Sequence, residues 1–146
     1  MSTSEPHLPV VPETERLMVE MTEAVLRERE IEYALEVPLL FFYIDLVFRD
    51  GEGELVAVEF KLHDWRRGIA QAKGHELGAS RMYVCLPAPR VTEKCREAAR
   101  EAGVGVLAWS PAEPLYEDVP ALRSNILVDV VQDWLEDSFM RRVVHV

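Results

Sequence analysis

The chain has 146 residues, the length of one domain with a full hydrophobic core. Apolar residues make up 49% of it and charged residues 29%, proportions typical of a globular protein and not of a disordered one. Twenty-six acidic against sixteen basic side chains give a net charge of −10, which argues against a surface built throughout to bind a polyanion.

Membrane insertion and secretion are not expected. The longest nearly apolar run, residues 37–44, is too short to cross a bilayer. Residues 1–16 show neither a basic segment nor an apolar segment of a secretory signal, so the cytoplasm is the expected compartment. Cys85 and Cys95 lack the spacing of a zinc site and are expected to be free thiols.

The first half of the chain predicts a leader, a helix and three strands. Residues 1–12 hold three prolines and predict a flexible leader, followed by a single domain over residues 13–146. Apolar residues at helical spacing predict a helix over residues 15–30, with Thr14 as its N-cap and its apolar face centred between Leu17 and Met21. The expected strands are residues 33–37, 40–49 and 54–62.

The second half predicts a β-α-β arrangement and a final helix. Asp64 is a natural N-cap for a helix that Gly78 ends, and three prolines mark a later loop. The last helix has an apolar stripe that could pack on its own domain or form a homodimer interface. The expected elements are a helix over 64–77, a strand over 81–86, a helix over 92–102, a strand over 104–109, a loop over 110–122, and a helix from Ser124 or Asn125 to Arg142.

The segment from Asp45 to Lys61 predicts a β-hairpin with charged residues on one face. Residues 51–53 form a glycine-containing loop that places Asp50 opposite Glu54. Counting back along both strands then places Asp45 opposite Glu59. Because side chains alternate between the faces of a strand, Lys61 shares the face of Glu59.

The two faces of this hairpin differ in composition. The face of Asp45 also carries apolar side chains, so we expect it to be covered by the rest of the domain, and buried charges need partners. Its apolar residues are Phe41, Tyr43, Val47, Leu55 and Ala57. The opposite face is entirely apolar: Leu40, Phe42, Ile44, Leu46, Phe48, Val56, Val58, Phe60 and Leu62.

Two facing carboxylates beside an ammonium group indicate a metal site. Carboxylates that face each other across a sheet repel unless a cation or a proton lies between them. Hard oxygen ligands with room for water suit Mg²⁺ or Mn²⁺. The sequence therefore predicts a divalent-metal site at Asp45 and Glu59, roughly 4–5 Å apart across the ladder.

Asp45 followed across a hairpin by Glu59-Phe60-Lys61 resembles the signature of the PD-(D/E)xK nuclease superfamily. The segment 64–72 after it is similar to the superfamily's post-motif helix, where many members carry a glutamine, here Gln71. The proline that names the motif is absent before Asp45, where Tyr43-Ile44 stand. The resemblance implies an α/β, restriction-endonuclease-like core of a helix, an antiparallel three-stranded meander, a helix and a fourth strand, here extended by a further helix, a strand and the C-terminal helix.

The resemblance also implies an activity, namely metal-dependent hydrolysis of phosphodiester bonds in DNA. Asp45, Glu59 and the Phe60 main-chain carbonyl would hold Mg²⁺ or Mn²⁺. Lys61 would orient the attacking water or stabilise the transition state, and Gln71 would position Lys61 or that water. A glutamate of the first helix often reaches the metal in this superfamily; Glu20 is favoured here, with Glu13 and Glu28 as alternatives.

DNA contact is expected from the few basic residues that follow the motif, namely Arg66, Arg67 and Lys73. His63 fits an ordinary histidine at a strand end, and His75 a surface residue of the second helix. The three tryptophans fit core packing better than base stacking. Specificity would come from substrate structure, a protein partner or an oligomer.

Two other functions stay open. One is a catalytically silent domain that keeps the fold for protein–protein interaction, which the net charge of −10 favours. The other is a metal-dependent hydrolase of small molecules that uses the same site.

Overall fold

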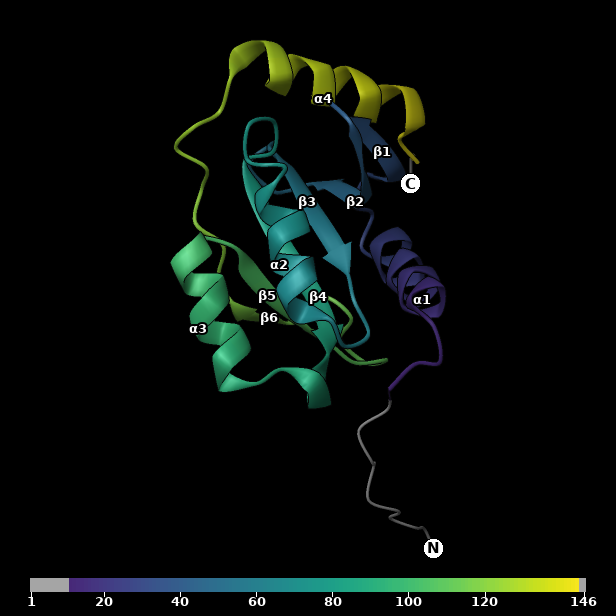
Figure 1. Ribbon diagram of the computed structural model, residues 1–146. Coiled ribbons are helices and arrows are strands. Elements are labelled where there is room, and N and C mark those ends of the chain that lie inside the picture. Colours follow the sequence, from purple (N-terminus) through teal and green to yellow (C-terminus); the bar gives the residue numbers. More distant parts are fainter. Residues whose placement is uncertain (1–10, 145–146) are drawn as a thin grey trace, which may run out of the picture.

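A computed structural model describes residues 11–144 as a six-stranded sheet with helices on both faces (Figure 1). Residues 1–10, most of the predicted leader, lie outside the described residues. The strands follow one another across the sheet in chain order. The elements are α1 Glu15–Glu28, β1 Tyr33–Leu39, β2 Phe42–Arg49, β3 Leu55–Phe60, α2 Trp65–Lys73, β4 Arg81–Pro87, a 3-10 turn Ala88–Arg90, α3 Glu93–Ala102, β5 Gly105–Trp109, β6 Glu117–Val119 and α4 Asp129–Arg142.

The predicted hairpin between β2 and β3 is confirmed with its predicted register. Leu46 lies opposite Val58, and Asp50 N donates a hydrogen bond of 2.8 Å to the Glu54 carbonyl. The Asp50 carboxylate accepts hydrogen bonds from two backbone amides of the loop, and Gly53 has a φ of +82° that favours glycine. The turn chemistry of the sequence thus sets the pairing of the two strands.

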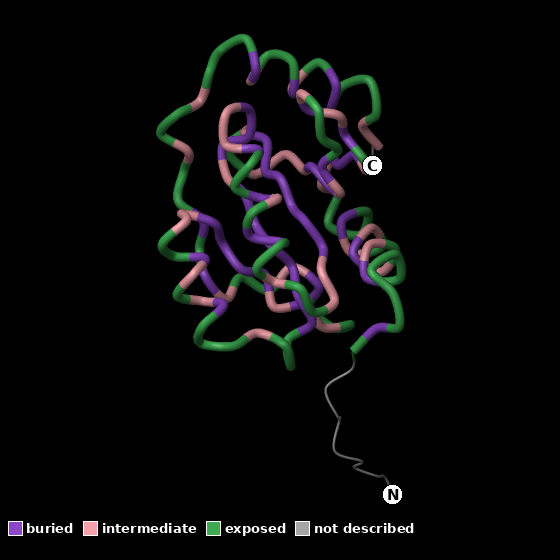
Figure 2. The backbone as a smooth tube through the Cα atoms, viewed as in Figure 1, coloured by how far each residue is buried: buried purple, intermediate pink, exposed green. Residues whose placement is uncertain are grey.

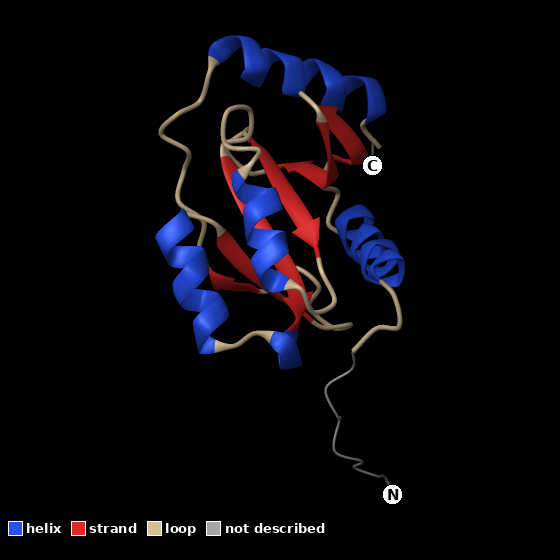
Figure 3. Ribbon diagram, in the orientation of Figure 1, coloured by secondary structure: helices blue, strands red, loops and turns tan. Residues whose placement is uncertain are grey.

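The sheet is antiparallel at its start and parallel in its middle. β1, β2 and β3 form the predicted meander, whereas β3, β4 and β5 run parallel, joined by crossovers through α2 and α3 (Figure 3). Strand β6 returns antiparallel to β5. None of the helices in the described part of the chain is long and apolar enough to span a membrane.

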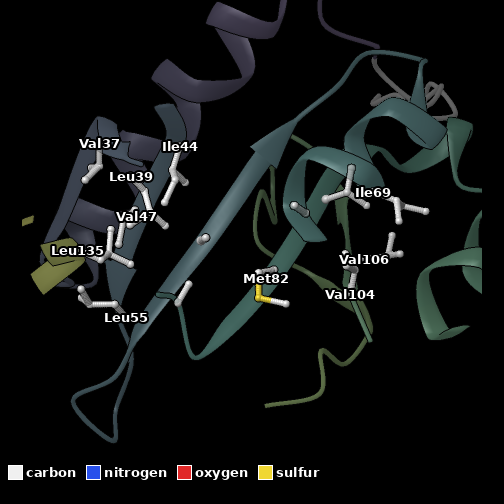
Figure 4. Packing of buried hydrophobic residues seen from close by; sticks show 14 of the residues in the cluster. Val37, Leu39, Ile44, Val47, Leu55, Ile69, Met82, Val104, Val106 and Leu135 are labelled. Carbon is white, nitrogen blue, oxygen red and sulfur yellow. The ribbon is translucent and has the colours of Figure 1, made fainter. Parts of the chain in front are cut away.

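The helices divide the hydrophobic core into two layers. Buried residues of α2, α3 and α4 pack on one face of the sheet, and buried residues of α1 pack on the other. Figure 4 shows part of the larger cluster, including Ile69 of α2 and Leu135 of α4. In Figure 2 the buried backbone runs through the central strands, between the more exposed helices. Strand β3 is buried at all six of its positions, so any polar group on it must find a partner inside the protein.

Side-chain caps hold three of the helices, two of them, Thr14 and Asp64, as predicted. Thr14 Oγ1 accepts from Leu17 N at 3.0 Å, Asp64 Oδ1 accepts from Arg67 N at 3.3 Å, and Thr92 Oγ1 accepts from Cys95 N at 3.2 Å. Gly103 ends α3 with a φ of +75°. These local signals lie within one turn of the residues that they fix.

The predicted apolar face of α1 is wrong by about one residue. Leu17 is 38% exposed, whereas Met18 and Thr22 are fully buried. Thr22 Oγ1 donates to the Met18 carbonyl at 2.7 Å and accepts from Trp109 Nε1 at 3.1 Å. A polar residue becomes part of the core because a distant tryptophan satisfies it, which helical spacing of apolar residues cannot reveal.

Three predicted boundaries are also wrong. Helix α2 ends at Lys73 instead of Leu77, and β6 lies inside the predicted loop 110–122. Helix α4 begins at Asp129 because the segment before it is bonded to the turn that follows α2. Ser124 N donates to the Ser80 carbonyl at 2.7 Å and Val128 N to the Leu77 carbonyl at 2.9 Å.

The alternation of side chains along β2 changes at Asp45. Leu46 packs in the α1 layer, but Ile44 packs with Val47 in the opposite layer, so the predicted common face of Ile44 and Leu46 is wrong (Figure 4). On the paired strand β1 the same change occurs at Glu36, which has a φ of +49°. A left-handed residue inside a strand turns the following side chains to the other face, and the sequence gives no signal for it.

Candidate metal and catalytic site

The candidate site lies where β2 and β3 separate. Regular pairing runs from the turn only as far as Leu46 opposite Val58. One residue further, each carboxylate bonds to the backbone of the other strand. Asp45 Oδ2 accepts from Phe60 N at 2.9 Å, and Glu59 Oε2 accepts from Asp45 N at 3.1 Å. The side chains replace the next bonds of the ladder, so Asp45 and Glu59 are held beside each other by backbone donors.

The two carboxylates border different cavities. Asp45 lines a cavity of about 480 Å³ together with residues of α1 and with Phe60. Glu59 lines a cavity of about 460 Å³ against α2. The pair therefore lies in the gap between the strands, open to α1 through one member and to α2 through the other. The predicted separation of their oxygens and the metal-binding role of the Phe60 carbonyl stay predictions.

Burial makes Asp45 hard to ionise. Desolvation first, and then the neighbouring Glu59, raises the pKa of Asp45 to about 6 from an ordinary 3.8. The hydrogen bond from Phe60 N and the charge of Lys61 oppose this shift of the pKa, whereas Glu15 adds to it. A carboxylate whose pKa is raised by burial and by a neighbouring acid is a group that a divalent cation would stabilise in its charged form.

Glu59 has a partner that the sequence analysis did not identify. His75 is 3% exposed, and its Nε2 lies 3.3 Å from Glu59 Oε2, so its predicted surface position is wrong. Its other nitrogen, Nδ1, is buried and has no hydrogen-bond partner in the described residues. His75 follows Gln71 by four positions, the spacing at which helical side chains share a face, and that spacing was the available signal.

Lys61 follows β3 directly and lies against α2. Its backbone amide donates to the Cys85 carbonyl at 3.0 Å, which continues the pairing with β4. A methyl group added at Gly68 would come within 2.8 Å of Lys61 Cγ and 2.6 Å of Val84 Cγ2. Glycine at this position therefore lets the Lys61 side chain pass close to the helix. Lys61 and Glu59 thus both lie beside α2. Asp45, which the hairpin alternation placed on the same face, lines the cavity on the α1 side instead.

Gln71 lies in the same cavity as Glu59. Its side-chain oxygen is buried and lacks a hydrogen-bond partner in the part of the chain that is described. An unsatisfied buried acceptor is costly, and a bound water, an ammonium group or a ligand donor would satisfy it. Gln71 is thus placed for the positioning role that the resemblance implies.

The acids of α1 differ in their closeness to Asp45. Glu20 lines the cavity of Asp45, but its side chain is 55% exposed and pairs with Arg16 at 3.1 Å. Glu15 lines that cavity as well, accepts a hydrogen bond from Leu62 N at 3.3 Å and acts on the pKa of Asp45. The alternatives Glu13 and Glu28 are exposed and do not border the cavity. Glu15, at the first position of the helix, was not considered from the sequence.

The three predicted DNA-contacting residues all belong to α2 but have different surroundings. Arg67 is exposed and lines the cavity of Glu59. Arg66 stacks over the Trp65 ring at 4.2 Å. Lys73 pairs with Glu76 at 2.8 Å and donates to the Ala102 carbonyl. Of the three, Arg67 is therefore the one that borders the candidate site. His63 is exposed and lies on the loop between β3 and α2.

The donor set fits one kind of metal. Within residues 11–144, no three His, Cys, Asp or Glu side chains are grouped so that they could hold an ion by themselves. Two carboxylates with a main-chain carbonyl would leave the remaining positions to water and to substrate. Mg²⁺ is commonly bound in that way, through one or two carboxylates and phosphate oxygens, whereas Zn²⁺ requires a fuller set of protein ligands.

Comparison with known proteins identifies the fold but no family. No family description matches the chain, and no curated protein is significantly similar to it in sequence. A solved protein of unknown function from Silicibacter pomeroyi is similar with a TM-score of 0.58 and 15% identity, over 85% of this chain and 82% of that one. EndoMS, solved in complex with double-stranded DNA, gives a TM-score of 0.50 and 18% identity over 75% of this chain and 49% of its own.

A repair endonuclease from Pyrococcus abyssi gives a TM-score of 0.49 and 17% identity, over 71% of this chain and 50% of its own. The chain thus spans about half the length of EndoMS and of this endonuclease. At identities this low, the similarity to the Silicibacter pomeroyi protein and to EndoMS shows a common fold and nothing finer. The mixed α/β architecture, with its meander and following parallel strands, is the restriction-endonuclease-like fold that the sequence predicted.

Proposed function

We propose that this chain is a metal-dependent nuclease that hydrolyses phosphodiester bonds in DNA. The observation that carries the proposal is the meeting of Asp45 and Glu59 at the opening between β2 and β3, beside Lys61. The fold it shares with EndoMS, which is solved on double-stranded DNA, supports a nucleic acid as the substrate.

Asp45, Glu59 and the Phe60 carbonyl would hold Mg²⁺ or Mn²⁺. A divalent ion there would lower the pKa of a water and offset the negative charge that develops on the phosphate. The backbone bonds to Phe60 N and Asp45 N fix one oxygen of each carboxylate, so the protein keeps both side chains in place before any ligand binds. Glu15 or Glu20 would add negative charge from α1.

Lys61 would donate a hydrogen bond to the attacking water or to a phosphate oxygen. Its stem lies against Gly68, so α2 limits the directions that its ammonium group can take. The free oxygen of Gln71 would accept from that ammonium group or from the water. His75, bonded to Glu59 Oε2, would hold the glutamate in its position.

The substrate would be held by few basic groups. Arg67 borders the site, while Arg66 and Lys73 would make outlying phosphate contacts from α2. A body with a net charge of −10 repels a polyanion elsewhere, so binding would depend on this one side of the molecule.

A plasmid assay tests the proposal. Wild type should nick supercoiled DNA with Mg²⁺ or Mn²⁺ and should be inactive in EDTA, whereas Asp45→Ala and Glu59→Gln should be inactive throughout. Asp137→Asn, which changes an exposed carboxylate on α4, is the matched control and should keep full activity. If wild type cleaves neither plasmid, branched nor single-stranded DNA and binds no divalent ion, the silent protein-binding domain is the better account.

We also propose that the chain forms a homodimer through α4. Val131 and Leu135 are buried against the sheet, but Val130 and Trp134 are 71% and 45% exposed on the outer side of the same helix. Exposed apolar side chains on one helix face are typical of a protein contact. Trp134→Glu should convert a dimer to a monomer in sedimentation equilibrium, and a wild-type protein that is monomeric at high concentration would contradict the proposal.

A further inference from the structure

Three adjacent aromatic residues are exposed at the tip of the hairpin between β1 and β2. Phe41 is 95% exposed, Phe42 59% and Tyr43 67%. The sequence predicted a covered position for Phe41 and Tyr43, and that prediction is wrong. No other run of adjacent exposed aromatic residues occurs within residues 11–144. A contiguous group of large, solvent-exposed apolar side chains is typical of an interaction site.

The tip is held by its neighbours. Leu39 is 2% exposed and pairs with Phe42, and the partly buried Leu40 packs against the larger core cluster. Leu40 has a φ of +56°, a left-handed backbone conformation that is unfavourable for a leucine. Strain of this kind is typical of functional positions, and here it accompanies the outward placement of Phe41.

The exposed aromatics share a cavity with the candidate site. The cavity of about 460 Å³ is lined by Phe41, Phe42 and Tyr43 from the hairpin and by Arg67 and Gln71 from α2, together with Glu59. This one cavity therefore combines three aromatic rings, the exposed guanidinium of Arg67, the buried and unpartnered side-chain oxygen of Gln71, and the carboxylate of Glu59 from the proposed metal site.

This combination has the chemistry of a single nucleotide with an accessible base. Aromatic side chains stack on a base whose face is free, and arginine binds the phosphate beside it. In a paired duplex the base faces are covered by their neighbours, so the rings would have nothing to stack on. An apolar peptide would use the rings but would bury the exposed Arg67 guanidinium without a suitable partner.

We propose that the hairpin tip and α2 form a subsite for an unpaired nucleobase next to the scissile phosphate. The inference rests on the proposed nuclease function and narrows its substrate to nucleic acid with an unpaired or displaced nucleotide: a single strand, a mismatch, a bulge or a flap. The sequence of bases is not read, because stacking accepts every base.

Binding to three oligonucleotides of equal length tests the subsite apart from catalysis. Each carries 2-aminopurine, whose fluorescence falls when it stacks: one is a single strand, one a duplex with the 2-aminopurine unpaired, and one a fully paired duplex. The measurements are made in EDTA, so no cleavage intervenes. Wild type should quench the fluorescence of unpaired 2-aminopurine. It should also bind the single strand and the duplex with the unpaired analogue about tenfold more tightly than the fully paired duplex.

Variants identify the side chains responsible. Phe41→Ala and Tyr43→Ala should each lose the quenching and about tenfold in affinity for the unpaired substrates, while binding of the paired duplex is unchanged. Phe41→Trp should keep both properties. Tyr116→Ala is the matched control, because Tyr116 is 53% exposed and lies outside this cavity, and it should behave as wild type. Thermal unfolding of each variant verifies that it is folded.

The outcomes separate the subsite from the proposed function. Equal binding and cleavage of all three substrates, indifferent to Phe41→Ala and Tyr43→Ala, would overturn the subsite and leave the nuclease proposal standing. Quenching that requires Phe41, in a protein that cleaves nothing with Mn²⁺, would support the subsite and reject the nuclease. Absence of binding to all three oligonucleotides would overturn the subsite, and the cleavage assay with Mn²⁺ would then decide the nuclease proposal separately.

Discussion

Asp45 gives the site a direct link between ionisation and stability. Its pKa is raised to about 6 by burial and by Glu59, so folding favours its protonated form. The corresponding stability is fully present below pH 4 and is lost as the pH rises through 6. At neutral pH, without a metal, an ionised Asp45 therefore destabilises the fold.

We expect Asp45→Asn to be more stable than wild type at pH 8 in EDTA. A shift of the pKa from 3.8 to about 6 corresponds to at most about 3 kcal/mol, and the gain should vanish near pH 4. Denaturant unfolding at both pH values measures it, with Asp137→Asn as a control that should show no such dependence. Saturating Mn²⁺ should stabilise wild type and not Asp45→Asn. Lower stability of the variant at pH 8 would show that Asp45 is not held as described.

Lys61→Ala should lower the rate of cleavage by roughly 10²–10³-fold, because a positioned donor that acts on transition-state charge is removed. The free energy of unfolding and the affinity for Mn²⁺ should change little. Single-turnover cleavage of a labelled duplex measures the rate, and Lys94→Ala, an exposed lysine of α3, is the control. Full activity of Lys61→Ala would place the role on another residue.

Local residue patterns account for part of this site. The pairing of Asp45 with Glu59 could be predicted from the sequence, because one short turn fixes the register between their strands. His75 and Glu15 could not, because each reaches the pair only after a helix has packed on the sheet. The exposure of Phe41 and Tyr43 depends on a change of side-chain alternation at Asp45 that no residue pattern indicates.

Among the elements, α2 is the one that fixes the position of Lys61. The close approach depends on Gly68, where an added methyl group would come within 2.8 Å of the Lys61 stem and 2.6 Å of Val84. Alanine is a better helix former than glycine by roughly 1 kcal/mol. Any loss of stability in Gly68→Ala must therefore come from the contact of the added methyl group with Lys61 and Val84.

Gly68→Ala should therefore reduce cleavage by at least about tenfold and destabilise the fold by about 1–3 kcal/mol, the usual cost of overpacking. Cleavage rate and chemical denaturation together measure both effects. Gly51→Ala is the control, because a methyl group there would meet no atom within 4 Å. A variant with higher stability and full activity would show that the helix does not constrain Lys61.

Elements defined by local signals were predictable, and those defined by distant contacts were not. Thr14, Asp64 and Thr92 cap helices whose starts the sequence located within a residue or two. Strand β6 forms only because β5 offers an edge, and α4 starts late because residues 124–128 bond to the turn after α2. Such boundaries depend on pairing between segments far apart in the chain.

At the scale of the whole molecule, the acidic charge limits DNA binding. Few phosphate contacts give a shallow dependence of log K on log salt, with a slope of roughly −2 to −4. Arg67→Glu should remove most binding, Arg66→Glu less, and Lys73→Glu least, because Lys73 is already paired with Glu76. Fluorescence anisotropy over a salt series measures the DNA affinity of wild type and of the three variants. A slope steeper than about −6, or indifference to Arg67→Glu, would place the DNA on another surface.

The central claim is that Asp45 and Glu59 hold one divalent ion. Anomalous diffraction from a crystal soaked in Mn²⁺ tests it most directly. We predict a single strong peak within coordination distance of one oxygen from each carboxylate, and its absence in Asp45→Ala. A peak elsewhere with none at this pair, or no peak at saturating Mn²⁺, would contradict both the metal site and the nuclease built on it.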